Sequence, residues 1–424
     1  MPEVFNSMRR PNAYQVYLFL SFASGMLFAA PFTQYYETVT AGLGPLQLIL
    51  VGTVLQVSRV VLEVPTGVIA DVYSRRLSIV LGYTLMGLGL FVEGLFPSFM
   101  PILAAQLIWA IGYTCISGAT EAWLSDEIGE ERANRAFLTA NRYDLSGNML
   151  GVLAATVLGS FTSAAATILV TAAASILLAV ALVFLMPEEG FKRTRPEGRC
   201  TLRQLATTFL QGLQTVRRRT VLLAILGIAL FYGTTAGFDR LWVKHLTDRF
   251  DLPILFGHNE LGFFGLLELA SRIPAILLIH QIEKGFDTSR PRVVGRLMLA
   301  ITAGLAVAIA VFAWSPFLGL AVALYLVIYS LQELTDPLLA AWMNQRLDPG
   351  VRATLLSMIA QSQAVGQAVG GLVIGVLASV LTVPLALLVS GGLLSPAVGF
   401  ILLANRHADI PHTPRVMSSP EDTP

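Results

Sequence analysis

The sequence predicts an all-α membrane protein with twelve transmembrane helices in two six-helix bundles, and with both termini in the cytoplasm. The first observation is composition: the 424 residues are 55% hydrophobic and only 13% charged, with a mean hydropathy of +0.68. Soluble proteins carry about 25% charged residues. The second is the recurrence of apolar segments long enough to cross a bilayer. The third is an alternation of basic and non-basic loops between them.

Twelve apolar segments each have the length of a membrane span, and each predicts one helix. The first block of six covers 14–36, 46–70, 77–95, 100–125, 136–160 and 165–187, and the second covers 221–245, 257–282, 293–313, 316–343, 353–380 and 383–404. We therefore predict an N-terminal bundle (1–187), a cytoplasmic central loop (188–219), a C-terminal bundle (220–405) and a disordered, polar cytoplasmic tail (406–424).

The first apolar segment has an alternative interpretation as a signal peptide. Arg9 and Arg10 precede it, and the small residues Ala29 and Ala30 follow, as in a secretory signal peptide. The apolar stretch continues to about Tyr36, which favours a first membrane span.

Basic residues collect on one predicted side of the membrane. They occupy the N-terminus, the turn at 75–76, the central loop and the loops at 284–296 and 346–352. The opposite loops 37–45, 96–99, 161–164, 314–315 and 381–382 contain no Lys or Arg, and only the loop after the seventh span, with Lys244 and Arg249, departs from the pattern. Because cytoplasmic loops collect Lys and Arg, both termini are expected in the cytoplasm.

Composition and motifs argue against several function classes. The net charge of +1 provides no field that would attract nucleic acid. Cys115 lies in an apolar segment and Cys200 in a polar loop, and the five histidines are scattered, so we expect no disulfide, metal or cofactor. We find no phosphate-binding glycine loop and no nucleophile elbow. The protein is not expected to be an enzyme, and any active transport would depend on an ion gradient.

The two blocks carry traces of an internal repeat. Ala122-Trp123 and Ala341-Trp342 are 219 residues apart, and Gly147 and Gly151 match Gly366 and Gly370 at the same offset. Six spans in each half keep the same orientation, so the halves would be parallel repeats about an axis along the membrane normal. Trp123 and Trp342, near predicted span ends, fit an interfacial aromatic belt.

A charged turn joins the second and third predicted spans. Its pattern Gly67-x-x-x-Asp71-x-x-x-Arg75-Arg76 resembles the loop signature of the major facilitator superfamily (MFS) of transporters. The twelve spans, the six-plus-six division and the basic central loop extend the resemblance over nearly the whole chain. It implies the MFS fold, a multi-pass location in the cell membrane, a monomer, and a substrate path between the halves that opens alternately to each side.

The signature departs from the family at two positions, since Val72 stands where arginine is usual and Ser74 where glycine is usual. For Asp71 the resemblance implies a latch, in which its carboxylate pairs with a basic side chain or a helix N-terminus when the cytoplasmic side closes. The alternative is that the turn acts only as a topology signal. Drug–proton antiporters of the superfamily usually carry an arginine in span 4 and a glycine-proline pair in span 5; both are missing here, although Arg142 on span 5 could replace the charge.

Ionisable side chains inside the predicted spans are the candidates for a substrate and proton path, because such groups are costly in a bilayer. In the first block they are Arg59, Glu63, Glu121, Arg142 and Asp144, and in the second Asp239, Arg240, Glu268, Arg272, Glu333 and Asp336.

Their spacing suggests different roles. Two pairs at i,i+4, Arg59–Glu63 and Glu268–Arg272, indicate ion pairs that pin or gate helices, with substrate contact as the alternative. Two acids without such a partner, Glu121 and Asp144, are candidates for proton coupling or binding. Glu333 and Asp336, three apart, fit either cation or proton binding or a structural hydrogen bond.

Small residues four apart predict close helix packing. They occur as Gly147-x-x-x-Gly151 on span 5, and as Gly366-x-x-x-Gly370 and Gly371-x-x-x-Gly375 on span 11. These stripes are either a rocking interface or plain close packing.

Together these features predict a secondary transporter that exports a small organic molecule against proton entry. Its partners would be the solute, protons and the lipid bilayer. Proton-coupled uptake, and a transporter-like receptor that binds without transporting, are the alternatives; the sequence does not specify the solute.

Overall fold

The computed structural model describes residues 12–27, 30–191, 220–287, 290–344 and 352–406, and every regular element within these ranges is helical. The first half contains α1 (Ala13–Met26), α2 (Ala30–Tyr35), the π-helix η1 (Tyr36–Thr40), α3 (Pro45–Val72), α4 (Arg75–Leu95), α5 (Phe99–Ile116), α6 (Ala119–Ile128), α7 (Glu130–Phe161) and α8 (Ala164–Leu185). The second half contains α10 (Thr220–Gly233), α11 (Ala236–Arg249), α12 (Leu261–Gly285), α13 (Pro291–Ala313), α14 (Leu318–Asn344), α15 (Arg352–Val380), α16 (Val383–Gly392) and α17 (Ser395–Arg406).

Ten helical segments of the described chain are long and apolar enough to cross a membrane. They coincide with ten of the twelve predicted spans. The other two predicted spans correspond to α7, whose first half is charged, and to α10 with α11, which are 14 residues each. The all-helical prediction is confirmed, while the count of twelve spans and the cytoplasmic side of the termini stay predictions. The predicted central loop and tail lie almost entirely outside the described residues.

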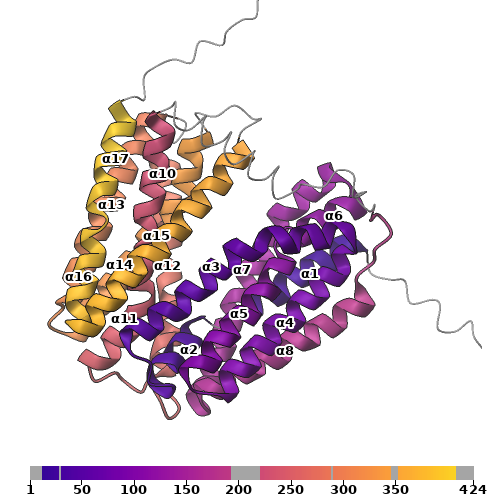
Figure 1. Cartoon of the computed structure of the whole chain (residues 1–424), viewed down its shortest axis with the longest axis horizontal. Helices are drawn as coiled ribbons and strands as arrows, with labels where there is room; N and C mark the ends of the chain where they lie inside the picture. Colours follow the sequence, from indigo (N-terminus) through magenta and orange to yellow (C-terminus); the bar gives the residue numbers. More distant parts are fainter. Residues whose placement is uncertain (1–11, 28–29, 192–219, 288–289, 345–351, 407–424) are drawn as a thin grey trace, which may run out of the picture.

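The helices form two bundles that adjoin at one end and diverge toward the other (Figure 1). Helices α3 and α15 pack across this junction, as do α7 and α12. Hydrogen bonds join the bundles there. Among them, the Leu46 N–H donates to Ser379 Oγ at 3.1 Å, and the His258 N–H donates to the Ser160 carbonyl at 2.7 Å. We call the end near α2 and α11 the closed end, and the opposite end, near α6 and α17, the open end.

Glycine brings α1 and α7 into backbone contact in the first bundle. A Cβ atom on Gly147 would overlap the carbonyl oxygen of Phe22, and one on Gly151 would lie 2.5 Å from the carbonyl oxygen of Met26. Only a residue without a side chain permits this approach.

The second bundle repeats the crossing with α10 and α15. A Cβ on Gly366 would overlap the carbonyl oxygen of Leu230, and one on Gly370 would lie 2.6 Å from Cγ2 of Thr234. These glycines stand 219 residues after Gly147 and Gly151. The same contact therefore recurs at the offset of the predicted internal repeat.

The other glycine stripe of α15 has a different neighbour. Gly371 and Gly375 face Ile49 of α3, where a Cβ would lie 3.3 Å and 3.0 Å from its side chain. One stripe thus packs inside a bundle, and the other packs between the bundles.

The expectation of an interfacial tryptophan belt is wrong. Trp123 is 1% exposed and Trp342 is 0% exposed, so neither ring reaches a membrane surface. The Trp123 indole Nε1–H donates to the carbonyl of Pro187 at 2.7 Å. Because a buried indole needs a hydrogen-bond acceptor, this contact anchors the segment after α8 to α6.

Candidate functional site

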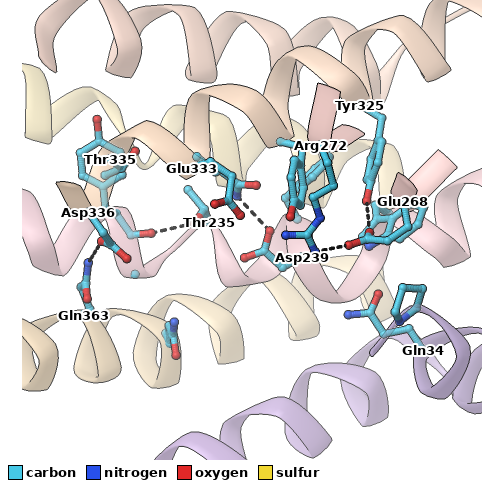
Figure 2. Close-up of a pocket in the computed structure, with 18 of the residues that line it drawn as sticks. Gln34, Thr235, Asp239, Glu268, Arg272, Tyr325, Glu333, Thr335, Asp336 and Gln363 are labelled. Atoms are coloured by element: carbon cyan, nitrogen blue, oxygen red, sulfur yellow. Dashed lines mark hydrogen bonds and ion pairs between the residues drawn. The ribbon is translucent and has the colours of Figure 1, made fainter. Parts of the chain in front are cut away.

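A cavity of about 620 Å³ opens on the inner face of the second bundle. Helices α10, α11, α12, α14 and α15 form most of its wall, and Gln34 of α2 reaches it from the first bundle (Figure 2). Its ionisable lining consists of four acids and one arginine: Asp239, Glu268, Glu333, Asp336 and Arg272. With four carboxyl groups and one guanidinium, the cavity lining has an excess of acidic groups.

The predicted pair Glu268–Arg272 is present on α12. Arg272 Nη2 lies 2.7 Å from Glu268 Oε1, and the Glu268 carboxylate is buried. The Tyr325 hydroxyl donates to the other carboxylate oxygen at 3.3 Å, and the Arg272 guanidinium lies 5.0 Å from the centre of the Tyr329 ring. The arginine is held at the wall and neutralises one of the four acids.

Two other acids are held by neutral amides. Gln332 Nε2 donates to Asp239 Oδ1, and Gln363 Nε2 donates to Asp336 Oδ1, each at 2.9 Å. An amide donor fixes a carboxylate without cancelling its charge. Glu333 is exposed to the cavity on the same helix as Asp336 (Figure 2).

Aromatic rings form an apolar side of this cavity. Trp242 of α11 and Tyr325 of α14 have ring centres 4.4 Å apart, and Tyr329 lies one turn further along α14, 6.3 Å from Tyr325. Aromatic faces carry partial negative charge, so they favour a positively charged ligand.

A second cavity, of about 660 Å³, lies on the inner face of the first bundle. Glu121 of α6 and Asp144 of α7 line it together with the stacked rings of Trp109 and Tyr113 of α5, whose centres are 5.4 Å apart. The structure thus brings together the two acids that the sequence proposed for proton coupling. Neither forms an ion pair within the described residues.

The predicted pair Arg59–Glu63 does not form. Arg59 Nη1 instead donates to Gln56 Oε1 at 2.9 Å, and its guanidinium lies 4.0 Å from the centre of the Tyr113 ring. Helical side chains lean toward the N-terminus, which takes Arg59 away from a residue four positions later. An ion pair at i,i+4 on a helix is more stabilising when the acid precedes the base, as Glu268 precedes Arg272.

Four of the predicted candidates lie outside the walls of both cavities. They are Arg59, Glu63, Arg142 and Arg240, of which Glu63 and Arg142 have exposed side chains.

The charged turn lies at the open end, and both of its ion pairs are formed within the first bundle. Asp71 is 3.5 Å from Arg75, and Arg75 is 3.2 Å from Asp126 of α6. The latch across the bundles therefore stays a prediction, because in this conformation the bundles diverge at this end (Figure 1).

The remaining turn residues support the start of α4. Ser74 accepts from the Leu77 N–H as the N-cap of α4, and its hydroxyl donates to Glu188 at 2.8 Å. The Arg76 N–H donates to the same carboxylate at 3.0 Å. A Cβ atom on Gly67 would meet no other atom within 4 Å, so this glycine is not required by packing in this conformation. A serine in place of the family's glycine thus acts as a helix cap.

Sequence reasoning missed a buried charged group at the closed end. Glu37 of η1 is 1% exposed and Glu93 of α4 is 2% exposed. Arg240 of α11 lies 3.5 Å from Glu37, and Gln106 Nε2 donates to Glu93 at 3.0 Å. Glu37 falls in a predicted loop. Glu93 lies inside the predicted span 77–95, and an acid within a span is the signal that could have identified Glu93.

The chain is similar to transporters over most of its length. The family model described as Major Facilitator Superfamily matches residues 16–371. The uncharacterized MFS-type transporter YxaM of Bacillus subtilis (strain 168) is 22% identical over 328 residues, which cover 76% of this chain and 78% of the relative.

Solved transporter structures have the same fold. The nucleoside transporter NupG has a TM-score of 0.75 at 16% identity, covering 93% of this chain and 99% of its own. A bacterial homologue of the human lysosomal transporter Spinster has a TM-score of 0.71 at 15% identity, covering 93% and 98%. At these identities the likeness establishes the fold and leaves the solute open.

Proposed function

Because this chain belongs to the Major Facilitator Superfamily, a family of transporters and not of enzymes, we propose that it is a proton-driven transporter of a small organic cation. Membership makes it a multi-pass protein of the cell membrane that acts on a small-molecule substrate. The solute, the driving ion and the direction are the parts of this statement that are proposed.

The acid excess of the second-bundle cavity is the observation that carries the proposal. Arg272 lies 2.7 Å from Glu268 and also interacts electrostatically with Glu333, so a single guanidinium faces the four carboxylates of the lining. A concave site of one charge sign attracts solutes of the opposite sign. An aromatic face can add about 0.5–2 kcal/mol to the binding of a cation.

The first-bundle cavity supports proton coupling. Glu121 and Asp144 stand across the molecule from the proposed cation site and are free of ion pairs among the described residues, so protons could load there without displacing an arginine. The sequence contains no nucleotide-binding glycine loop, which leaves an ion gradient as the energy source.

Export is the direction we favour. With the predicted orientation, the open end faces the cytoplasm, and both cavities would take up solute from there. Proton-coupled uptake is the alternative, because an alternating-access cycle visits the same conformation in either direction.

Binding of two ions with the same shape and opposite charge tests the solute class. Tetraphenylphosphonium should bind the purified protein at least about tenfold more tightly than tetraphenylborate, since the charged lining discriminates between them. The Glu333→Gln/Asp336→Asn variant should lose most of this preference, and Glu131→Gln, at an exposed surface position, should keep it. Equal affinity for the two ions, or stronger binding of the borate, would overturn the cation assignment.

Flux in proteoliposomes tests the coupling. An imposed pH gradient should accelerate counterflow of the labelled phosphonium ion. Binding without counterflow would favour the receptor alternative, and flux that ignores the gradient would exclude proton coupling.

A further inference from the structure

The closed end contains a buried charged cluster that joins the two bundles. We call Glu37, Glu93, Gln106 and Arg240 the closed-end cluster. The first three belong to the first bundle and Arg240 to the second. The Arg240–Glu37 ion pair therefore links the bundles, unlike Glu268–Arg272, which lies within one helix.

A notch in α3 admits the arginine. A Cβ atom on Gly52 would overlap Nε of Arg240 and would lie 3.0 Å from its Cζ. The guanidinium is therefore inserted between α3 and η1 of the opposite bundle. Opening this end requires the arginine to leave the notch and the Glu37 carboxylate to lose its partner.

Several carboxylate oxygens of the cluster receive no hydrogen bond from the described residues. Both oxygens of Glu37 and Oε1 of Glu93 are buried without a hydrogen bond, whereas Oε2 of Glu93 accepts from Gln106. Arg240 approaches Glu37 at 3.5 Å, an ion-pair distance without a hydrogen bond. Buried carboxylate oxygens normally accept hydrogen bonds, so these atoms require an additional donor or cation.

The charge balance has the same implication. Glu93 interacts electrostatically with both Glu37 and Arg240. The two carboxylates are 1% and 2% exposed, so together with one guanidinium they leave one buried negative charge, which is strongly unfavourable. One proton on either carboxyl group removes that charge and converts one acceptor without a partner into a donor.

Other polar groups near the cluster do not supply the missing charge. Tyr35 donates to Glu260 and Tyr36 to the Gly94 carbonyl. Asp239, next to Arg240 on α11, is held by Gln332, and it would add negative charge. The facing part of α3 and the whole of α8 contain no ionisable residue.

We propose that Glu37 and Glu93 hold one exchangeable proton between them, and that this proton with Arg240 locks the closed end. Protonation stabilises the closed conformation because the cluster is then neutral. Loss of the proton leaves a buried negative charge, which is relieved when the bundles separate and water enters. The lock is thus a second proton site, separate from the one proposed at Glu121 and Asp144 in the first-bundle cavity.

Distances between spin labels test the lock without any solute. In a background with Cys115→Ser and Cys200→Ser, labels at Phe96→Cys and Phe317→Cys report on the two sides of the closed end, since both positions are exposed. Raising the pH from about 5 to about 9 should increase the long-distance population, by up to about tenfold per pH unit where one proton is released.

Amide variants imitate the protonated carboxyl group. Glu93→Gln and Glu37→Gln should each remain closed at all pH values, because one carboxylate then faces one guanidinium. Asp251→Asn, at an exposed acid in the loop between α11 and α12, should keep the wild-type pH response. A carboxylic acid C=O band in infrared spectra of the wild type should disappear in Glu93→Gln or Glu37→Gln.

Three results would overturn the lock: a wild-type distance that does not respond to pH, an unchanged response in both amide variants, or a response to Na⁺ in place of pH. If neither variant folds, the wild-type distance and infrared measurements still decide. This inference rests on the proposed function in one respect, that the proton is the driving ion. Failure of the lock leaves cation binding intact, and loss of gradient-driven flux with an intact pH response would count against the proposed function alone.

Discussion

Gly366 of α15 lies directly against the main chain of Leu230 of α10, so close that any side-chain carbon at Gly366 would overlap the Leu230 carbonyl oxygen. The corresponding crossing in the first bundle places Gly147 against Phe22. These contacts set how closely, and at what rotation, each pair of helices packs.

Alanine at Gly366 should destabilise the protein. Overpacking costs about 1–3 kcal/mol, which exceeds the gain of up to about 1 kcal/mol from replacing a helical glycine. Thermal unfolding in detergent should show a lower melting temperature for Gly366→Ala. Gly399→Ala is the matched control, because no atom lies within 4 Å of a Cβ there; it should be neutral or stabilising. Equal melting temperatures of the two variants would contradict the packing account.

Removal of Arg272 alone should be more harmful than removal of the pair. Arg272→Gln leaves Glu268 buried without its cation, which costs about 3–5 kcal/mol. The double variant Glu268→Gln/Arg272→Gln should recover part of this loss, giving a coupling energy measurable by a double-mutant cycle in thermal unfolding. The exposed pair Glu131–Arg135 is the control and should show no measurable coupling. Additive losses at Glu268 and Arg272 would show that the two side chains act independently.

Trp123→Phe should lower stability through the lost indole bond to Pro187. A buried acceptor left without its donor costs about 1–3 kcal/mol. Trp314→Phe is the control, since that ring is 52% exposed. The melting temperature should fall for Trp123→Phe only. An unchanged value for Trp123→Phe would mean that the hydrogen bond contributes nothing.

Asp71→Asn should weaken closure of the open end if the latch exists. Spin labels at Leu138→Cys and Phe286→Cys, both exposed, would report on the two bundles at this end. The variant should show a smaller short-distance population than the parent, because a neutral amide loses its attraction to a basic group or a helix N-terminus. Asp287→Asn, an exposed acid of the second bundle, should leave the distribution unchanged. The same distribution in Asp71→Asn would remove the latch.

Glu121→Gln and Asp144→Asn should reduce gradient-driven flux while the second-bundle cavity still binds the cation. We expect a loss of about tenfold or more in flux for each, with little change in affinity, because the first-bundle cavity is separate from the cation site. Glu63→Gln is the control, since this acid is exposed and outside both cavities. Wild-type flux in Glu121→Gln and Asp144→Asn would remove these two acids from the coupling step.

Features that depend on neighbours along one helix could be predicted from the sequence alone. Apolar length placed the helices, and the glycine spacing marked α7 and α15 as helices that pack closely against a neighbour. The order Glu268 before Arg272 specified an ion pair that the structure contains. Each of these follows from helix periodicity and from the restricted reach of a side chain, so no tertiary information is needed.

The surface that each side chain meets depends on how the helices pack against one another, and the sequence did not predict it. A residue on a membrane helix can face lipid, another helix or a cavity, and the choice depends on the rotation of that helix against its neighbours. That rotation buried Trp123, although its place near the end of a span predicted a position at the membrane surface. It also brought Arg240 to Glu37, although they lie in different helices and in different halves of the chain. No local pattern encodes such a meeting, because it arises from the packing of two complete bundles.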